Sequence, residues 1–197
     1  MNWKAKFILF AVSLAICSCN KTYYDNKRPS YLSKPDFNID LKHKEVFKEM
    51  DQMPEVFDLI DMEKNENQIK SSNLNYTIRD STFHLTSGNI KTNCKARIYK
   101  NDLIVNLGFN TGYGGNGISI VFNQGNQNYY IKESGYTDVI YKAKRSQEII
   151  HQHLILDKLS YNPSDSVYGY VEFNILKKEN EHIEKHIGNG YFRCKIQ

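Results

Sequence analysis

The feature that most constrains this chain is an alternation of apolar and polar residues from about Leu74 onward. A period of two residues is typical of strands with one buried face. In two of the clearest segments the repeating positions are Leu103, Val105, Leu107 and Phe109, and Val167, Gly169, Val171, Phe173 and Ile175. Turn signals at residues 163–165 and 188–190 interrupt the alternation. The pattern predicts roughly eight to ten short strands.

The same pattern limits the possible topologies. No long helical segment separates the expected strands, so hairpins are favoured over parallel crossover connections. A chain of 197 residues suffices for one ordinary domain with extensions. We therefore expect an antiparallel β-sandwich over residues 74–197, with a partly closed β-barrel as the alternative.

Residues 19–73 are expected to form a tether, with one or two short helices, that precedes this domain. The stretch as far as about residue 39 is polar and contains Pro29 and Pro35, which is typical of a tether. Asp40 is a possible cap for a short helix whose apolar face holds Leu41, Val46, Phe47 and Met50. Residues 55–62 form a second short helix or an extended segment.

The N-terminus is organised like a secretory signal. Lys4 and Lys6 precede a ten-residue apolar stretch, Phe7 to Ile16, which is too short to span a bilayer. The apolar stretch ends in Ile16-Cys17-Ser18-Cys19, which resembles the lipobox of bacterial lipoproteins. The resemblance covers about the first 20 residues.

That resemblance implies a signal peptide over residues 1–18 and acylation, palmitate included, at Cys19. Cys17, preceded by Leu14-Ala15-Ile16, is the alternative anchor. More than one acyl chain holds a soluble domain on a membrane. The expected location is therefore the bacterial cell envelope, with the membrane and its face left open.

Charge and motifs narrow the function further. Lys+Arg number 26 and Asp+Glu number 22, and removal of Lys4 and Lys6 leaves 24 − 22, or +2. This balance gives no broad basic surface for nucleic acid. There is no G-x-S-x-G motif and no identifiable catalytic triad, so we expect no enzymatic activity, no catalytic residues and no cofactor.

Cys94 and Cys194 both fall on apolar strand faces. Export permits a disulfide between them, and two separate buried thiols are the alternative. His151 and His153 share one face of a predicted strand, which makes them a weak metal candidate because no third ligand is evident.

A glycine-rich segment is the best candidate for a binding loop, because glycines allow close approach of a partner. It comprises Gly112, Tyr113, Gly114, Gly115, Asn116 and Gly117. The leading hypothesis is a non-enzymatic interaction or accessory lipoprotein that contacts an envelope protein. A glycan-binding surface lipoprotein is the alternative, using exposed asparagines and exposed tyrosines such as Tyr113 and Tyr136. A metal-dependent enzyme at His151 and His153 is the third.

Overall fold

The computed structural model describes residues 31–55, 69–81, 83–110, 114–137 and 145–197. Its strands form two open sheets that pack face to face, which confirms the predicted β-sandwich; within these residues no barrel closes. The strands are β1 (Asp36–Phe37), β2 (Ser72–Asp80), β3 (Leu85–Thr86), β4 (Asn93–Tyr99), β5 (Asp102–Asn110), β6 (Gly114–Asn123), β7 (Asn128–Glu133), β8 (Tyr136–Thr137), β9 (Arg145–Leu156), β10 (Ser166–Glu179) and β11 (His182–Lys195).

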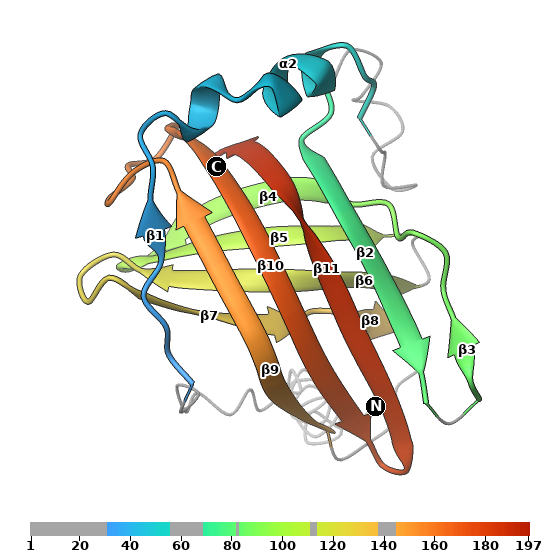
Figure 1. Cartoon of the computed structure of the whole chain (residues 1–197). Helices are drawn as coiled ribbons and strands as arrows, with labels where there is room; N and C mark the ends of the chain where they lie inside the picture. Colours follow the sequence, from blue (N-terminus) through green and yellow to red (C-terminus); the bar gives the residue numbers. More distant parts are fainter. Residues whose placement is uncertain (1–30, 56–68, 82, 111–113, 138–144) are drawn as a thin grey trace, which may run out of the picture.

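The larger sheet has the strand order β1-β9-β10-β11-β2-β3, and the smaller has β4-β5-β6-β7 with β8 paired to β6. All neighbours are antiparallel except β1, which pairs in parallel with β9. The strands of the two sheets cross at a steep angle (Figure 1). This is the orthogonal manner of packing two twisted sheets.

The core lies between the sheets, where the alternation placed it. Val167, Val171 and Phe173 of β10 face inward, and Leu103 and Leu107 of β5 belong to the same cluster. Each of these side chains is at most 1% exposed. Burial of one such side chain contributes roughly 1.5–3 kcal/mol, so this two-sided core supplies most of the driving force for folding.

Two aromatic rings cover glycines on the neighbouring strand. A Cβ added to Gly169 would lie 2.0 Å from Cζ of its register partner Phe192, and one added to Gly188 would lie 2.6 Å from Cζ of Phe173. Gly190 has φ +151°, and a Cβ there would lie 2.2 Å from a carbonyl oxygen of β2. The prediction of a turn at residues 188–190 is therefore wrong. These residues lie inside β11, where Gly188 and Gly190 leave space for the Phe173 ring and for the backbone of β2.

Part of the segment predicted as a tether belongs to the sandwich. Asp36 and Phe37 pair with Ile155 and Leu156, which extends the larger sheet by a strand. Ser33 forms a bridge with Tyr129 on β7. The structured domain thus begins well before residue 74.

A short helical segment crosses one end of the larger sheet (Figure 1). It consists of a 3-10 turn, Leu41–His43, and the helix α2, Glu45–Asp51. Leu41, Phe47 and Met50 are buried, as the sequence predicted, and they pack against Tyr168 and Tyr191 on the outer face of the sheet. Asp40 precedes the 3-10 turn, but its side chain makes no capping hydrogen bond.

Several sequence predictions lie outside the described residues. They are the signal peptide, the lipobox, the first part of the tether, and the second short helix beyond Glu55. Among the described residues, no helix has the length and apolar character needed to cross a membrane.

Glutamine side chains close one side of the sandwich. Gln152 of β9 accepts a hydrogen bond from the Ile131 N–H of β7 at 3.0 Å, and Gln147 accepts one from the Glu133 N–H at 3.0 Å. The two glutamines are five residues apart, so a regular strand would point them to opposite faces. A register shift opposite Asn174 and Ile175 adds one residue to β9 and brings both to the inner side. The edge of β7 is thereby protected by side-chain amides.

Candidate functional site

The outer face of the larger sheet is covered at one end and open at the other. Phe47 of α2 covers Tyr168 and Tyr191 through edge-on ring contacts. Beyond this end of the sheet, none of the described elements covers the face of β9, β10, β11 and β2 (Figure 1). The open part of this face is therefore a surface that a partner could contact directly.

The strand register gathers polar side chains on this open face. Glu172, Asn189 and Asn75 form one row across β10, β11 and β2. The next row along the strands holds Asn174, Ile187 and Thr77 on the same three strands. Three of the six side chains are carboxamides, each of which both donates and accepts hydrogen bonds.

These rows form a groove, which we call the amide groove. It has a volume of about 580 Å³, and Arg79 and His151 line it together with the residues of the two rows. This volume falls within the range of about 300–1,000 Å³ that is common for ligand sites. The groove is open to solvent, so a ligand would lie along the sheet face.

The charges around the amide groove are balanced. His151 Nε2 lies 3.5 Å from Glu172 Oε1, and the two side chains are 52% and 46% exposed. An exposed pair of this kind contributes at most about 1 kcal/mol, so it positions the two groups without fixing them firmly. Arg79 adds a positive charge at the other side of the groove.

Tyr170 lies two residues before Glu172 on β10 and borders the first row. Partial burial raises the pKa of Tyr170, and the nearby negative charge of Glu172 adds to the effect. The phenol therefore stays neutral at physiological pH.

Asn174 is the least satisfied polar residue of the groove. Its Oδ1 is buried, and no hydrogen-bond partner for it exists among the described residues. A buried acceptor without a partner costs about 1–3 kcal/mol. Such groups are rare in folded proteins and need an explanation. Asn174 lines the groove, so a ligand there is one way to provide the missing donor.

The structure separates the two histidines proposed as metal ligands. His151 and His153 do lie on the same outer face of β9, but each faces its own carboxylate. His153 Nε2 lies 2.9 Å from Asp36 Oδ2 on β1. In the part of the chain that the structure describes, no three His, Cys, Asp or Glu side chains are grouped as a metal site.

The glycine-rich loop is shorter than the sequence suggested. Gly114, Gly115, Asn116 and Gly117 belong to β6 and pair with β5 or β8. A Cβ added to Gly117 would lie 2.7 Å from a carbonyl oxygen of β5, so close strand approach requires this glycine. Gly112 and Tyr113 lie outside the described residues, as does the side chain of Tyr136.

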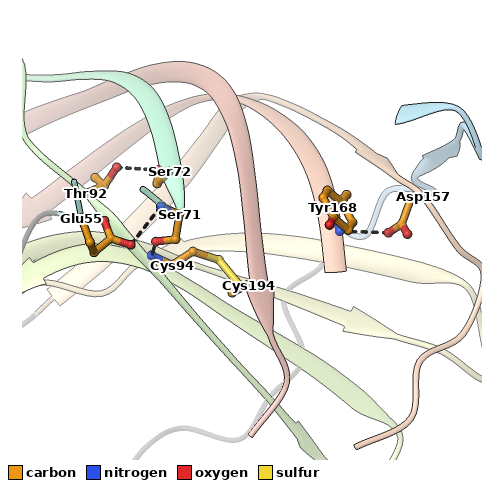
Figure 2. The surroundings of a disulfide bond; sticks show 8 residues. All are labelled: Glu55, Ser71, Ser72, Thr92, Cys94, Asp157, Tyr168 and Cys194. Atoms are coloured by element: carbon orange, nitrogen blue, oxygen red, sulfur yellow. Dashed lines mark hydrogen bonds between the residues drawn. A yellow bond between two sulfur atoms is a disulfide. The ribbon is translucent and has the colours of Figure 1, made fainter. Parts of the chain in front are cut away.

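Cys94 and Cys194 form a disulfide that links β4 of the smaller sheet to β11 of the larger. Figure 2 shows the bond beside Ser71, whose hydroxyl accepts a hydrogen bond from the Cys94 N–H at 2.8 Å. Ser72 and Thr92 are hydrogen-bonded at 2.7 Å close by. The disulfide thus ties the two sheets together where several polar contacts already hold them.

A chain of polar groups also lies inside the sandwich. Tyr76 Oη is 2.6 Å from His186 Nδ1, and His186 Nε2 is 3.4 Å from Glu184 Oε2. Glu184 also pairs with Lys177 at 3.0 Å. The hydrogen bond from His186 is the main reason why the pKa of Glu184 is lowered to about 2. Burial, with the negative charges of Glu133 and Glu184, raises the pKa of Tyr76.

No protein-family model matches this chain, and no curated protein or solved structure matches it significantly. The amide groove was not anticipated from the sequence. Its residues occupy ordinary outward positions on separate strands, and only the register between those strands brings them together. Outward asparagines such as Asn75 are ordinary on a solvent-facing strand, so they gave no signal of the groove.

Proposed function

We propose that this protein is a bacterial lipoprotein, anchored through Cys19, that serves as a non-enzymatic interaction or accessory protein of the cell envelope. Its contact surface is the open outer face of the larger sheet. The observation that carries the proposal is the amide groove, with the unpaired Oδ1 of Asn174 at its border.

The attachment of the chain suits such a role. Residues 20–30 would connect the acylated Cys19 to Tyr31, and eleven residues reach at most about 35–40 Å. The Tyr31 carbonyl accepts a hydrogen bond from Gln152 of β9 at 3.0 Å, so the tether enters at the β7–β9 side of the sandwich. The strands β11 and β2, which carry much of the groove, lie farther across the sheet.

The buried polar chain supports a non-enzymatic role. Tyr76 and His186 are both 0% exposed, so a substrate in solution does not meet them in this conformation. On the outer face of β9, His151 and His153 each lie beside a carboxylate, Glu172 and Asp36 respectively. The groove is therefore better suited to binding than to covalent catalysis.

Acyl labelling tests the anchor. Cells that express the full chain are given an alkyne-tagged palmitate analogue, and the label on the protein is measured. We expect Cys19→Ser to abolish the label and Cys17→Ser to retain it. Persistent label on Cys19→Ser would overturn the assignment, and loss on Cys17→Ser alone would move the anchor by two residues.

Site-specific photo-crosslinking in cells tests the contact surface. A benzophenone amino acid replaces Asn75, which is exposed and lines the groove, or Arg97, which is exposed on the outer face of the smaller sheet. We expect a discrete crosslinked product from position 75 and none from position 97. Equal products at both positions, or none at position 75, would contradict the proposed surface.

A further inference from the structure

Building on that contact surface, we propose that the amide groove binds a neutral oligosaccharide, because the register of β10, β11 and β2 sets three carboxamides around one apolar side chain. The carboxamides belong to Asn75, Asn174 and Asn189, and the apolar side chain is Ile187. The proposal depends on the proposed function but adds the chemistry of the ligand.

The hydrogen-bonding groups fit sugar hydroxyls. Each hydroxyl donates one hydrogen bond and accepts others, and each carboxamide does both as well. Asn75 and Asn189 are exposed and face each other across β2 and β11 as register partners. Thr77 adds a hydroxyl in the next row. A ligand with many hydroxyls could therefore meet several of these groups at once.

The charge of the groove argues for a neutral ligand. Arg79 and Glu172 carry opposite charges, and His151 lies beside Glu172. An acidic polysaccharide would be drawn to a cluster of like positive charges, which the described lining does not contain. A cationic ligand would need an excess of carboxylates, which is equally absent from the lining.

The groove has one apolar side chain, Ile187, between polar side chains that could bind hydroxyls. Ile187 is partly exposed between Asn174 and Thr77 in the second row. A sugar ring presents C–H groups on its faces and hydroxyls around its edge. Contact of the C–H groups with Ile187 would leave the hydroxyls facing the carboxamides on either side.

Asn174 supplies the observation that points to an occupant. Its Oδ1 is buried without a partner, while the side chain borders the groove. A turn of the side chain toward the groove would let a ligand hydroxyl or amide N–H donate to this oxygen. Pairing would remove part of the cost of the unpaired acceptor and so favour binding.

A polypeptide is the less suitable occupant. Extended peptides usually add to the edge of a sheet, where backbone N–H and C=O groups are free. The groove lies on the face of the sheet, where β10 and β11 are paired on both sides. The outer edge of β2 beside the groove is already bonded, because Tyr76 accepts a hydrogen bond from the Ile90 N–H and donates its own N–H to Asn89 Oδ1. A protein partner is therefore treated as a separate outcome of the test.

Calorimetric titration of the full acylated chain in detergent micelles tests the proposal. The probes are chitohexaose and cellohexaose, which share hydroxyls but differ in acetamido groups. We expect saturable binding of at least one, weakened about 5- to 10-fold by Asn75→Ala or Asn189→Ala, as the loss of one or two hydrogen bonds implies. The matched control Arg97→Ala should bind as the wild type does.

The outcomes separate this proposal from the one it rests on. Binding of chitohexaose alone assigns recognition to the acetamido group, and binding of both probes assigns it to the hydroxyls. No saturable heat at millimolar probe, unchanged affinity in both asparagine variants, or stronger binding of polygalacturonate would overturn the oligosaccharide proposal. If crosslinking at position 75 then captures a protein, the contact surface stands with a different partner. If crosslinking also fails, the proposed function falls with it.

Discussion

The phenol of Tyr76 and the imidazole of His186 are hydrogen-bonded at 2.6 Å with both side chains fully buried. Glu184 is an acceptor when ionised, so His186 Nε2 donates to it, while Nδ1 is bonded to the Tyr76 hydroxyl. His186 thus joins an inward tyrosine to a partly exposed carboxylate.

Removal of the Tyr76 hydroxyl should destabilise the fold. Tyr76→Phe keeps the ring but leaves Nδ1 of His186 buried without its hydrogen-bond partner. We expect the free energy of unfolding to fall by about 1–3 kcal/mol in urea titrations. Tyr99→Phe, at a site that is 61% exposed, is the control and should change little. A Tyr76→Phe protein as stable as the control would contradict the assigned hydrogen bond.

Acid should weaken the fold through Glu184. Its pKa is lowered from 4.5 to about 2, so its contribution is fully present above about pH 4.5 and is lost as the pH falls toward 2. Glu184→Gln should therefore be less stable than the wild type at neutral pH. The difference in unfolding free energy should shrink between pH 4.5 and 2. A constant difference across that range would show that the carboxylate is not stabilised in this way.

The disulfide should contribute strongly because it connects distant parts of the chain. Cys94 and Cys194 are 100 residues apart, and a loop of that size corresponds to about 4–5 kcal/mol in the chain-entropy model. The double variant Cys94→Ala/Cys194→Ala should lose stability of this order in chemical unfolding. Addition of a reductant should destabilise the wild type and leave the variant unchanged. A loss below about 1 kcal/mol would mean that other contacts hold the two sheets together.

The glutamine side chains between β7 and β9 give a local prediction. Gln152 accepts from the Ile131 N–H, and its amide nitrogen donates to the Tyr31 carbonyl and to Ser33 Oγ. In Gln152→Leu, hydrogen exchange at the Ile131 amide should quicken at least tenfold, the equivalent of about 1.4 kcal/mol. Glu148→Ala, an exposed site on the same strand, is the control. Unchanged protection at Ile131 would exclude this role for Gln152.

The alternation of the sequence was enough to predict the sandwich and most of its inward residues. Val167, Val171 and Phe173 face the core because a strand with one buried face has a period of two. The same reasoning failed in β9, where one extra residue reverses the parity and turns Gln147 and Gln152 to the same side. A bulge of this kind has no signal in the pattern.

Contacts between distant strands could not be predicted from the sequence, for a different reason. The alternation placed Cys94 and Cys194 on apolar faces, but it gave no pairing between strands that are 100 residues apart. The amide groove depends on the same information, since Asn75, Asn174 and Asn189 come from three strands. Their assembly follows from the register, which is set by the whole sandwich.

The central claim is that the open face of the larger sheet is the binding surface, and side-chain amide NMR tests it most directly. Chitohexaose is added to the ¹⁵N-labelled full chain in micelles, and the signals of all asparagine amides are followed. We predict that the largest shifts belong to Asn75, Asn174 and Asn189, with the backbone amide of Arg97 unchanged. Shifts centred on residues 114–117 would contradict the account, as would the absence of shifts with both chitohexaose and cellohexaose together with no crosslink at position 75.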